Sequence, residues 1–364
     1  MRFLPRNREK LILWYERYFS PVFLVAGFLS DNFILLRRVD LWRTNALLFF
    51  YLLVCGLGII YINLVDEKRI TRDRLVRIVP IVFIAMQFSF GGLFSGFLSL
   101  YSRSASLASS WIFVFLFAAL LIGNERFIRL YRKYVFQLAM YFLCIFSFLI
   151  FFLPVLYKKV GAQMFLTSSV LSVLLIFLFL LLLRFLTPKA VVANRVKTLS
   201  SIGIIYVIFV SAYFLNIIPP LPLAIKSAGV YHSVSRSSDT YTLTGESVSW
   251  YDTFMNYNTT LHIPEGDPAY VYAAIFAPTG LSIDLVHEWQ QYSTTTKSWQ
   301  TEDVIRFPIV GGRDGGYRTY TAKTSIDPGQ WRVNVRMVDG QLIGRVTFTV
   351  VYSDATTTLT TRTE

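Results

Sequence analysis

Three arginines near the C-terminus alternate along two neighbouring segments, and they are the side chains best suited to bind a charged ligand. Arg332 and Arg336 lie in "WRVNVRMV", and Arg345 lies in "QLIGRVTFTV". If both segments are strands, alternation places all three on one face together with Asn334. Guanidinium groups are permanently charged forks that bind carboxylates and phosphates. The pattern fits an anion-binding face for lipid headgroups, a polyanionic glycan or an acidic protein, and it equally fits solvated charges on an exposed sheet.

A glycine-rich segment, "VGGRDGGYR" over residues 310–318, adds Arg313 and Arg318 to the candidate binding residues. It looks superficially like a phosphate-binding loop. Such a loop needs a following helix whose N-terminal amides point at the phosphate, and it carries Lys followed by Ser or Thr. Neither a helical pattern nor that pair is found here. We therefore interpret the segment as a glycine-rich hairpin.

Neither the histidines nor the cysteines form a catalytic or metal-binding pattern. In "IDLVHEW", alternation places His287 on one face of a strand and Glu288 on the other. A hydrolase centred on these two residues would need a serine in a recognisable nucleophile elbow, and the sequence contains none. Cys55 and Cys144 lie inside apolar runs, which excludes cysteine-based zinc in the polar half of the chain. The sequence therefore predicts a protein that is not an enzyme and has no cofactor or metal.

The arginines would be positioned by a hairpin whose register can be predicted. Asp339-Gly340 favours a two-residue type I′ turn, which needs positive φ at both positions. This turn would place Val338 opposite Gln341, so that both strands bury the same face. The predicted inward pairs join Trp331, Val333, Val335 and Met337 to Phe348, Val346, Gly344 and Leu342, respectively.

This hairpin belongs to a polar region in which the hydrophobic period is two and short segments are bounded by Gly, Pro, Asp and Asn. Such spacing predicts an all-β immunoglobulin-like sandwich over residues 225–352. A proline-rich spacer, 219–224, precedes it. The threonine-rich end, 353–364, has little apolar area and is predicted to be disordered. Strands are expected near 239–244, 257–262, 269–277, 281–292, 302–310, 316–325, 329–338 and 341–352.

The first 218 residues are much more apolar. Hydrophobic residues make up 54% of the whole chain and charged residues 16%, whereas soluble proteins carry about 25% charge. A transmembrane helix needs ~20 mostly apolar residues. The sequence therefore predicts a multi-domain protein, with an all-α polytopic membrane domain over residues 1–218 in front of the sandwich. About seven transmembrane helices are expected, near 18–36, 43–64, 80–101, 107–123, 135–157, 166–186 and 200–218.

The basic residues indicate how the membrane domain is oriented. Residues 1–218 contain 24 Lys and Arg against 8 Asp and Glu, while residues 219–364 contain 11 against 14. Alternate connections between the apolar runs carry 18 and 6 of the basic residues. Because basic connections stay in the cytoplasm, the N-terminus is expected inside and the C-terminal domain outside, with no cleavable signal peptide. The clusters form no continuous stripe, so a nucleic-acid partner is not expected.

The predicted spans contain few polar side chains that suit transport. Asp31 is the one carboxylate inside a span, which leaves open a small-solute transporter or sensor with a cavity near it, or a hydrogen-bonded role at a helix end. Ser89, Gly92, Gly96 and Ser99 form a stripe that lets another helix approach closely, either from the same chain or from a second copy. The membrane domain is interpreted as a scaffold, and oligomer formation is left open.

Several dispersed segments resemble a known family. They are "IPPLPLAIKSAGVYH", "AAIFAPTGL", "HEW", "IVGGRDGGYRTYTAK" and "PGQWRVNVRMVDGQLIGRVTFTV". Together they resemble an uncharacterised bacterial membrane-protein family, domain of unknown function 2914, over most of residues 217–351. The opening "ERYFSPVFLVAGFLSDNFILLRRVDL" is similar to the membrane half of that family. The resemblance implies a bacterial envelope protein with a membrane-tethered β domain, and it implies no activity, cofactor or catalytic residue.

These observations lead to one expected function. The chain is expected to be a binding or assembly protein, anchored in the bacterial inner membrane, that presents a periplasmic β-sandwich to an envelope glycan or to another membrane protein. The lipid bilayer is its first expected partner. A transporter or sensor that uses Asp31 is the alternative.

Overall fold

The fold is described from a computed structural model. It describes residues 41–104, 107–124, 126–218, 222–238, 240–247, 259–312, 315–353 and 358–364. The chain divides into two compact units, which are considered separately below. A helical unit ends at Ile218, and a β unit comprises residues 219–364 together with the short segments 103–110 and 158–161.

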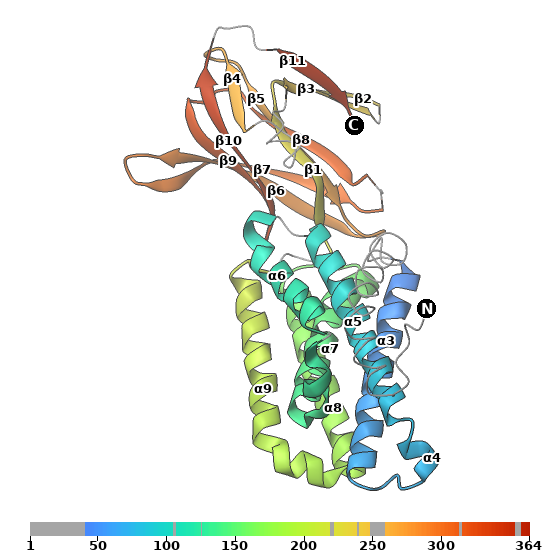
Figure 1. The fold of residues 1–364 in the computed structure, drawn as a ribbon. Coiled ribbons are helices and arrows are strands. Elements are labelled where there is room, and N and C mark those ends of the chain that lie inside the picture. Colours follow the sequence, from blue (N-terminus) through green and yellow to red (C-terminus); the bar gives the residue numbers. More distant parts are fainter. Residues whose placement is uncertain are drawn as a thin grey trace, which may run out of the picture. The chain divides into compact units, whose positions relative to one another are not determined.

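The helical unit consists of long, strongly apolar helices (Figure 1). Five helical stretches in the described part of the chain are long and apolar enough to cross a membrane, which fits the predicted membrane association. They are Trp42–Asp66, Asp73–Tyr101, Tyr134–Tyr157, Ala162–Leu186 and Pro188–Phe214. The elements are α3 (Trp42–Asp66), α4 (Asp73–Val76), α5 (Val79–Ser104), α6 (Leu107–Asn124), the 3-10 helix η2 (Arg126–Arg132), α7 (Tyr134–Tyr157), α8 (Ala162–Leu186) and α9 (Pro188–Phe214).

The predicted count of seven helices stays a prediction. The first expected span, 18–36, lies outside the described residues, and so does Asp31. The expected span 107–123 corresponds to α6, of which Val114–Asn124 is apolar but short. What the structure supports is a helical N-terminal part followed by a β-rich C-terminal part.

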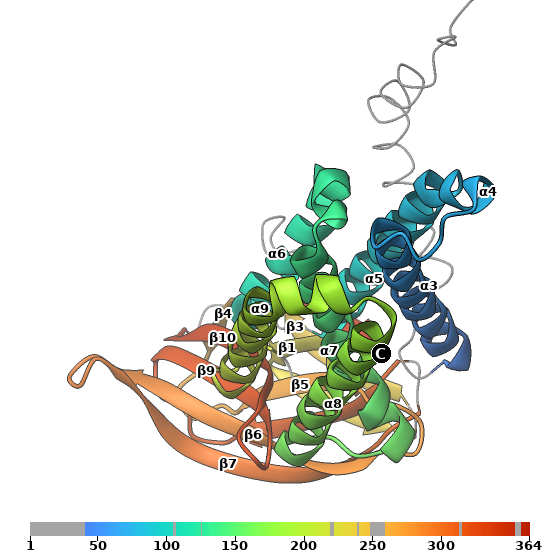
Figure 2. The ribbon, with the colours of Figure 1, turned by 90° about the horizontal axis from the view of Figure 1, so that it is seen from below.

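Helix α7 is the centre of the helical unit. It packs against α3, α8 and α9 (Figure 2). Of its apolar 18-residue stretch, 78% is buried, compared with 28% of the corresponding stretch in α8 and in α9. Apolar side chains that point away from the bundle can face lipid without cost, so α8 and α9 are suited to a bilayer. The helical unit therefore has a buried apolar centre and an apolar outer surface.

The small-residue stripe lies on α5 and meets another helix of the same chain at Gly92. A Cβ atom added there would approach Cε2 of Tyr51, on α3, to 2.5 Å. Ser89, Gly96 and Ser99 are buried. Close intrachain packing, one of the two interpretations left open by the sequence, therefore applies at Gly92.

The described residues of the β unit form three sheets. A three-stranded sheet has the order β1-β5-β8, a five-stranded sheet the order β4-β10-β9-β6-β7, and a second three-stranded sheet the order β11-β3-β2. The strands are β1 (Ala224–Tyr231), β2 (Ser233–Ser237), β3 (Thr240–Glu246), β4 (Thr260–Ile263), β5 (Ala269–Phe276), β6 (Ser282–Ser293), β7 (Ser298–Val310), β8 (Tyr317–Lys323), β9 (Gly329–Met337), β10 (Leu342–Tyr352) and β11 (Leu359–Thr363).

The β1-β5-β8 sheet is the middle of three layers. On one side Val271 of β5 shares a core with Trp289 and Trp331 of the five-stranded sheet. On the other side Tyr272 packs in a separate cluster with Leu243 of the β11-β3-β2 sheet. Strand β5 is therefore buried on both faces and reads as a nearly continuous apolar run. The predicted two-sheet immunoglobulin-like sandwich is not confirmed, because it lacks the third sheet.

The β9-β10 hairpin has the predicted register over most of its length. Trp331 lies opposite Phe348, Val333 opposite Val346, and Val335 opposite Gly344, as expected. The register then shifts by one residue between Leu342 and Gly344. The predicted pairing of Met337 with Leu342 is therefore wrong, and Leu342 lies opposite Arg336.

The predicted type I′ turn at Asp339-Gly340 is also wrong. Gly340 N–H donates to Met337 O at 3.0 Å, so Val338 and Asp339 are the central residues of the turn. Gly340 follows with a φ of +94°, while Asp339 is not among the residues with positive φ. A turn of this kind is followed by one left-handed residue, and Gly340 supplies it. Val338, Asp339 and Gly340 therefore form a three-residue loop, and the predicted pairs begin beyond the irregularity between Leu342 and Gly344.

The predicted ends of the β domain need correction. Residues 219–221 of the expected spacer lie outside the described residues, and β1 begins at Ala224. The tail 353–364, predicted to be disordered, contains β11, which pairs antiparallel with β3. Its main chain continues the ladder at Glu364, whose N–H donates to Tyr241 O at 2.9 Å. Threonines favour strands, and hydrogen bonds to an open sheet edge order the backbone without a large apolar area.

Candidate functional site

The candidate site is the outer face of the five-stranded sheet, which we call the arginine face. It is formed where β10, β9, β6 and β7 lie side by side. Arg345 on β10 lies opposite Asn334 on β9, and Asn334 in turn lies opposite Glu288 on β6. Because successive side chains on a strand point to opposite faces, the residues two positions away join the same face. The members of the arginine face are Glu288, Gln290, Thr301, Arg332, Asn334, Arg336 and Arg345.

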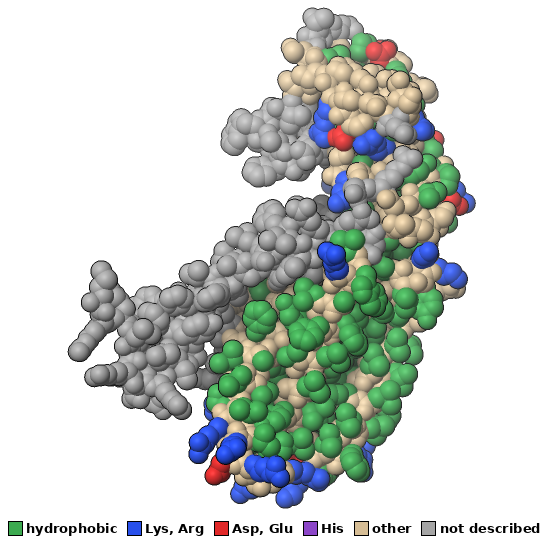
Figure 3. Space-filling model, turned by 90° about the vertical axis from the view of Figure 1, so that its right-hand side faces the viewer, with side chains coloured by type: hydrophobic (Ala, Val, Ile, Leu, Met, Phe, Trp, Pro, Cys, Tyr) green, Lys and Arg blue, Asp and Glu red, His purple; other side chains and the backbone are tan. Residues whose placement is uncertain are grey.

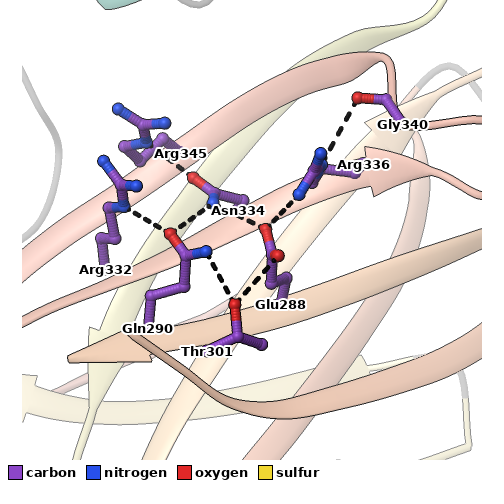
Figure 4. A network of polar contacts seen from close by, with 8 residues as sticks. All are labelled: Glu288, Gln290, Thr301, Arg332, Asn334, Arg336, Gly340 and Arg345. Atoms are coloured by element: carbon purple, nitrogen blue, oxygen red, sulfur yellow. Dashed lines mark hydrogen bonds and ion pairs between the residues drawn. The ribbon is translucent and has the colours of Figure 1, made fainter. Parts of the chain in front are cut away.

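Asn334 is the centre of the hydrogen-bond network on this face (Figure 4). Its Nδ2 donates to Glu288 Oε2 at 2.9 Å and to Gln290 Oε1 at 3.1 Å. Its Oδ1 accepts from Arg345 Nε at 2.6 Å. The residue is only 3% exposed, and a buried amide of this kind is stable because its hydrogen-bonding groups are paired. Asn334 therefore fixes the side chains of β6 and β10 relative to β9.

Arg336 is neutralised within the face. Its Nη1 lies 2.5 Å from Glu288 Oε2, and its Nε donates to Gly340 O at 3.4 Å. Burial alone would raise the pKa of Glu288, but hydrogen bonds from Asn334 and Arg336, together with the charge of Arg336, lower it. The carboxylate is therefore ionised at neutral pH and offsets one of the three positive charges.

Arg332 is held by a hydrogen bond and an aromatic ring. Its Nε donates to Gln290 Oε1 at 2.6 Å, and Gln290 Nε2 donates to Thr301 Oγ1 at 2.9 Å. The guanidinium carbon lies 4.3 Å from the centre of the Trp299 ring, a distance typical of a cation–π contact. Trp299 itself meets Tyr292 edge to face at 5.3 Å. The β6-β7 hairpin, which extends beyond the neighbouring strands in Figure 1, thus supports one arginine.

Two of the three cations keep their terminal nitrogens available. Within the part of the chain that the structure describes, Arg332 and Arg345 use Nε for hydrogen bonds, and their Nη groups have no hydrogen-bond partner. Figure 4 shows these two guanidinium groups on one side of the network and Arg336 on the other. Arg345 is exposed and Arg332 half-buried.

Burial and neighbouring positive charges disfavour the charged forms of both arginines. Burial, and then the charge of Arg345, lower the pKa of Arg332 to about 10. Burial lowers the pKa of Arg345, and the charge of Arg336 lowers it further, although Glu288 opposes this effect. Both remain charged at neutral pH. An anion bound between them would reduce this repulsion, so its binding is electrostatically favoured.

The sequence predicted only part of this face. Arg332, Asn334, Arg336 and Arg345 come together as expected, but Arg318 does not join them. It lies on β8, opposite Ala274 of β5 in the middle sheet. Arg313 lies outside the described residues.

The supporting residues of the face were not assigned to the site from the sequence. Alternation from His287 had placed Glu288 on the outer face, and the same pattern extends to Gln290 two residues later. Trp299 and Thr301 gave no such signal, because a bulge between Trp289 and Gln290 changes which residues of β7 lie beside β6.

A shallow pocket of about 220 Å³ adjoins the Arg336 end of the face. Its lining combines apolar side chains with three charged ones, Glu288, Arg306 and Arg336. Sites that enclose a small molecule are deeper and have volumes of about 300 to 1,000 Å³. The pocket is therefore a depression at the edge of the arginine face.

His287 lies in the core of the β unit. It is fully buried, and its Nδ1 lies 2.9 Å from Thr321 Oγ1, which also accepts from Trp289 Nε1 at 3.1 Å. Burial lowers the pKa of His287 to about 3, so the ring is neutral at physiological pH. Glu288 points to the opposite face, toward Arg336. His287 and Glu288 therefore do not share one site, as a hydrolase centred on these two residues would require.

The glycine-rich segment does not form an anion-binding loop at its described residues. Gly311 N–H donates to Leu281 O at 2.8 Å, and Gly312 N–H donates to Ala277 O at 3.0 Å. A Cβ atom at Gly311 would collide with the Pro278 carbonyl. The glycine therefore permits close backbone packing between the start of β6 and the end of β7, and its amide is already used.

Glu246 forms a second polar cluster in the β11-β3-β2 region, which sequence spacing gave no reason to expect. Its Oε1 lies 3.1 Å from His232 Nε2, and its Oε2 lies 3.0 Å from His262 Nδ1. Oε1 also accepts from the His262 backbone N–H at 2.6 Å. In the described residues no group of three or more His, Cys, Asp or Glu side chains is arranged to hold a metal ion. The cluster therefore ties β3 to β4 and to the β1-β2 connection.

The β6-β7-β9-β10 region that carries the arginine face was then compared with known families. Residues 283–350 match the family DUF2914, described as a protein of unknown function. The DUF2914 match confirms the resemblance that the sequence indicated. It begins in β6 and ends in β10, so it includes every member of the arginine face.

Other comparisons give less. No curated protein matches the chain. Among solved structures, the chain is similar at a low level to Pseudomonas fluorescens alkylpurine DNA glycosylase AlkC bound to DNA containing an abasic site analog. The TM-score is 0.23 and the identity 11%, over 82% of this chain and 96% of that chain. A similarity of this size carries no argument about fold or function.

Proposed function

We propose that the chain is a non-enzymatic, membrane-anchored binding protein, whose DUF2914 region recognises an anionic group of an envelope partner through the arginine face. The helical unit is the anchor, and the β unit is placed in the periplasm. The partner is an envelope glycan or another membrane protein. The single observation that carries the proposal is the pair Arg332 and Arg345, whose Nε atoms are fixed and whose Nη groups point out of the network.

Pre-positioned charges support recognition of an anion. Each guanidinium is already held in place by a neighbouring amide oxygen, so little side-chain entropy remains to be lost when a ligand binds. Glu288 balances Arg336, which leaves a local excess of positive charge at the other two arginines. On a face of solvated charges, the guanidinium groups of Arg332 and Arg345 would not need buried amide side chains such as Asn334 and Gln290 to orient them.

The placement in the periplasm is supported by charge. The connection that contains α4 is rich in basic residues, and Figure 3 shows Lys and Arg gathered at that end of the apolar surface. Basic connections are retained in the cytoplasm. An odd number of crossings after a cytoplasmic N-terminus would then place the β unit on the opposite side.

A reporter fused after Glu364 tests the placement in living cells. Alkaline phosphatase is active only when exported, so its activity there is the expected result. A fluorescent protein that matures only in the cytoplasm serves as the reverse reporter. Fluorescence together with absent phosphatase activity would remove the periplasmic role.

Binding is tested on the full chain in detergent, with inorganic pyrophosphate as the probe. Loss of a charge-assisted hydrogen bond costs about 1.5 to 3 kcal/mol, so Arg332→Gln and Arg345→Gln should each weaken binding roughly tenfold to hundredfold. Arg362→Gln is the matched control, because Arg362 pairs with Glu364 on a different sheet. Equal affinity in all four proteins, or no affinity in any of them, would refute the proposal.

A further inference from the structure

The arginine face is an open surface, and that limits the shape of its ligand. Arg345 and Thr347 of β10 are exposed, and the depression at the Arg336 end is too small to enclose a molecule. From β10 to β7 the face crosses three strand spacings, or about 14 Å. A ligand that contacts the two available arginines and Trp299 of β7 must therefore be extended.

Cations, aromatic rings and hydroxyl groups occur together at one end of this surface. Trp299 lies under the Arg332 guanidinium, and Tyr292 packs against the edge of Trp299. Thr347 lies directly opposite Arg332, and Thr349 follows two residues later on the same face of β10. Aromatic side chains offer an apolar body beside a polar edge, which suits a sugar ring. The threonine hydroxyls can exchange hydrogen bonds with sugar hydroxyls.

A membrane surface fits this end of the sheet less well. Lipid-binding surfaces combine basic residues with apolar side chains that enter the bilayer. Here the exposed Val304 and Val338 lie at the Arg336 end, next to the depression. Arg336 is four residues from Arg332 along β9, or about 13 Å. The exposed apolar side chains are thus separated from the two available arginines.

We infer that the ligand of the arginine face is an acidic polysaccharide, which lies across the strands with its carboxylates on the Nη groups of Arg332 and Arg345 and a sugar ring beside Trp299. The inference rests on the proposed function and specifies its ligand. Arginine binds a carboxylate through two parallel N–H donors, so uronic-acid groups match the planar forks. Two adjacent forks can engage successive acidic sugars of one chain, which raises the affinity through multivalency.

The test compares three probes on the full chain embedded in nanodiscs of zwitterionic lipid. Polygalacturonate is the acidic polysaccharide, dextran the neutral one, and vesicles containing phosphatidylglycerol the anionic membrane. The expected result is binding of polygalacturonate and of neither other probe. Arg332→Gln and Arg345→Gln should each weaken polygalacturonate binding about tenfold or more, while Arg362→Gln leaves it unchanged.

Two further variants keep the test independent of folding defects. Arg345→Lys retains the charge but loses the planar fork. This variant should bind polygalacturonate, with an affinity several-fold lower than that of the parent. Trp299→Leu should reduce affinity for polygalacturonate more than affinity for pyrophosphate, because only the polysaccharide has a sugar ring. Equal reduction for both probes would remove the sugar-stacking part of the inference.

The two proposals fail in different ways. If pyrophosphate binds in an arginine-dependent manner and polygalacturonate does not, the polysaccharide is overturned and the anion site stands. If the vesicles bind in its place, the partner is a membrane surface and the inference is wrong. If no anionic probe binds, the inference and the proposed function fall together.

Discussion

His287 and Glu288 are neighbours in the chain, yet they lie on opposite faces of one sheet and have opposite electrostatic environments. On the inner face, burial lowers the pKa of His287 to about 3, and the ring stays neutral beside Thr321. On the outer face, hydrogen bonds from Asn334 and Arg336 overcome the effect of burial and keep Glu288 charged. The inner face excludes charge, whereas the outer face gathers it. The fold and the candidate site thus depend on different sides of the same four strands.

Truncating a side chain on the inner face should lower the free energy of unfolding far more than truncating one on the outer face. Trp331 is 1% exposed, packs in the core with Trp289 and Phe348, and donates through Nε1 to Asp327 O at 2.8 Å. Replacing a buried Trp by Ala leaves a large cavity and typically costs about 3 to 5 kcal/mol. Trp331→Ala should therefore reduce the free energy of unfolding by that amount, measured by pulse proteolysis of the full chain in urea. A loss below about 1 kcal/mol would mean that the core is not closed around this residue.

The inward-facing residues of the β9-β10 hairpin could be predicted from the sequence, because they depend on a local pattern. Alternation along residues 331–337 and 342–348, with a turn between them, determines which side chains face inward, and three of the four predicted pairs are confirmed. A single glycine changed the turn, since a three-residue loop with one left-handed residue satisfies the backbone as well as a type I′ turn does. The error affected one pair and the face of one side chain, because Ile343 lies in the core where Leu342 had been predicted.

Non-local pairings were beyond the sequence. Strand β4 pairs in parallel with β10, and β11 pairs with β3, over separations of more than 80 residues. The pairing partner of each strand does not depend on its local sequence pattern. It depends on which sheet edges remain unpaired once the other strands have assembled. The same holds for the site. Its arginines could be named from alternation, but Gln290 and Trp299 join them only because β6 and β7 are the next strands in the sheet.

The centre of the outer face should respond next in magnitude. Asn334→Ala removes hydrogen bonds to Glu288, Gln290 and Arg345, and leaves their polar atoms without that partner. A buried polar group left unpaired costs about 1 to 3 kcal/mol. The same variant should weaken pyrophosphate binding, because Arg345 loses the bond that fixes its Nε. Thr361→Ala, on the exposed strand β11 of a different sheet, is the control for both measurements.

If Asn334→Ala lowered stability without changing anion affinity, the network would be purely structural. The division of the sheet into a supporting inner face and a ligand-binding outer face would then lose its main link.

Acid should destabilise the protein through the inner face. The folded-state pKa of His287, about 3, lies below its ordinary value of 6.5, so the unfolded chain binds a proton more readily. Stability from this residue is complete above about pH 6.5 and is lost as the pH falls. Between pH 8 and pH 5 the loss should be about 2 kcal/mol, measured as the difference in free energy of unfolding. This range lies above the titration of Glu288, whose pKa is lowered.

A matched pair of variants assigns the acid effect. His287→Gln should remove the part of the pH dependence between pH 8 and pH 5 that His287 causes, about 2 kcal/mol, at the cost of lower stability throughout. His262→Gln, in the Glu246 cluster, should keep the part of the pH dependence that His287 causes. An unchanged pH profile in His287→Gln would show that the ring is protonated in the folded protein or is accessible to water.

The smallest effect on stability should come from Arg345, one of the two residues on which binding depends. Its side chain is exposed, and its substitution has two opposing effects on stability. Arg345→Gln loses the Nε donor to Asn334, but it also relieves repulsion with Arg332, whose pKa is lowered by this neighbour. The two effects oppose each other, so the free energy of unfolding should stay within about 1 kcal/mol of the parent while pyrophosphate affinity falls. A gain in the free energy of unfolding would support the comparison most strongly. It would mean that holding two like charges close together for a ligand lowers the stability of the ligand-free protein.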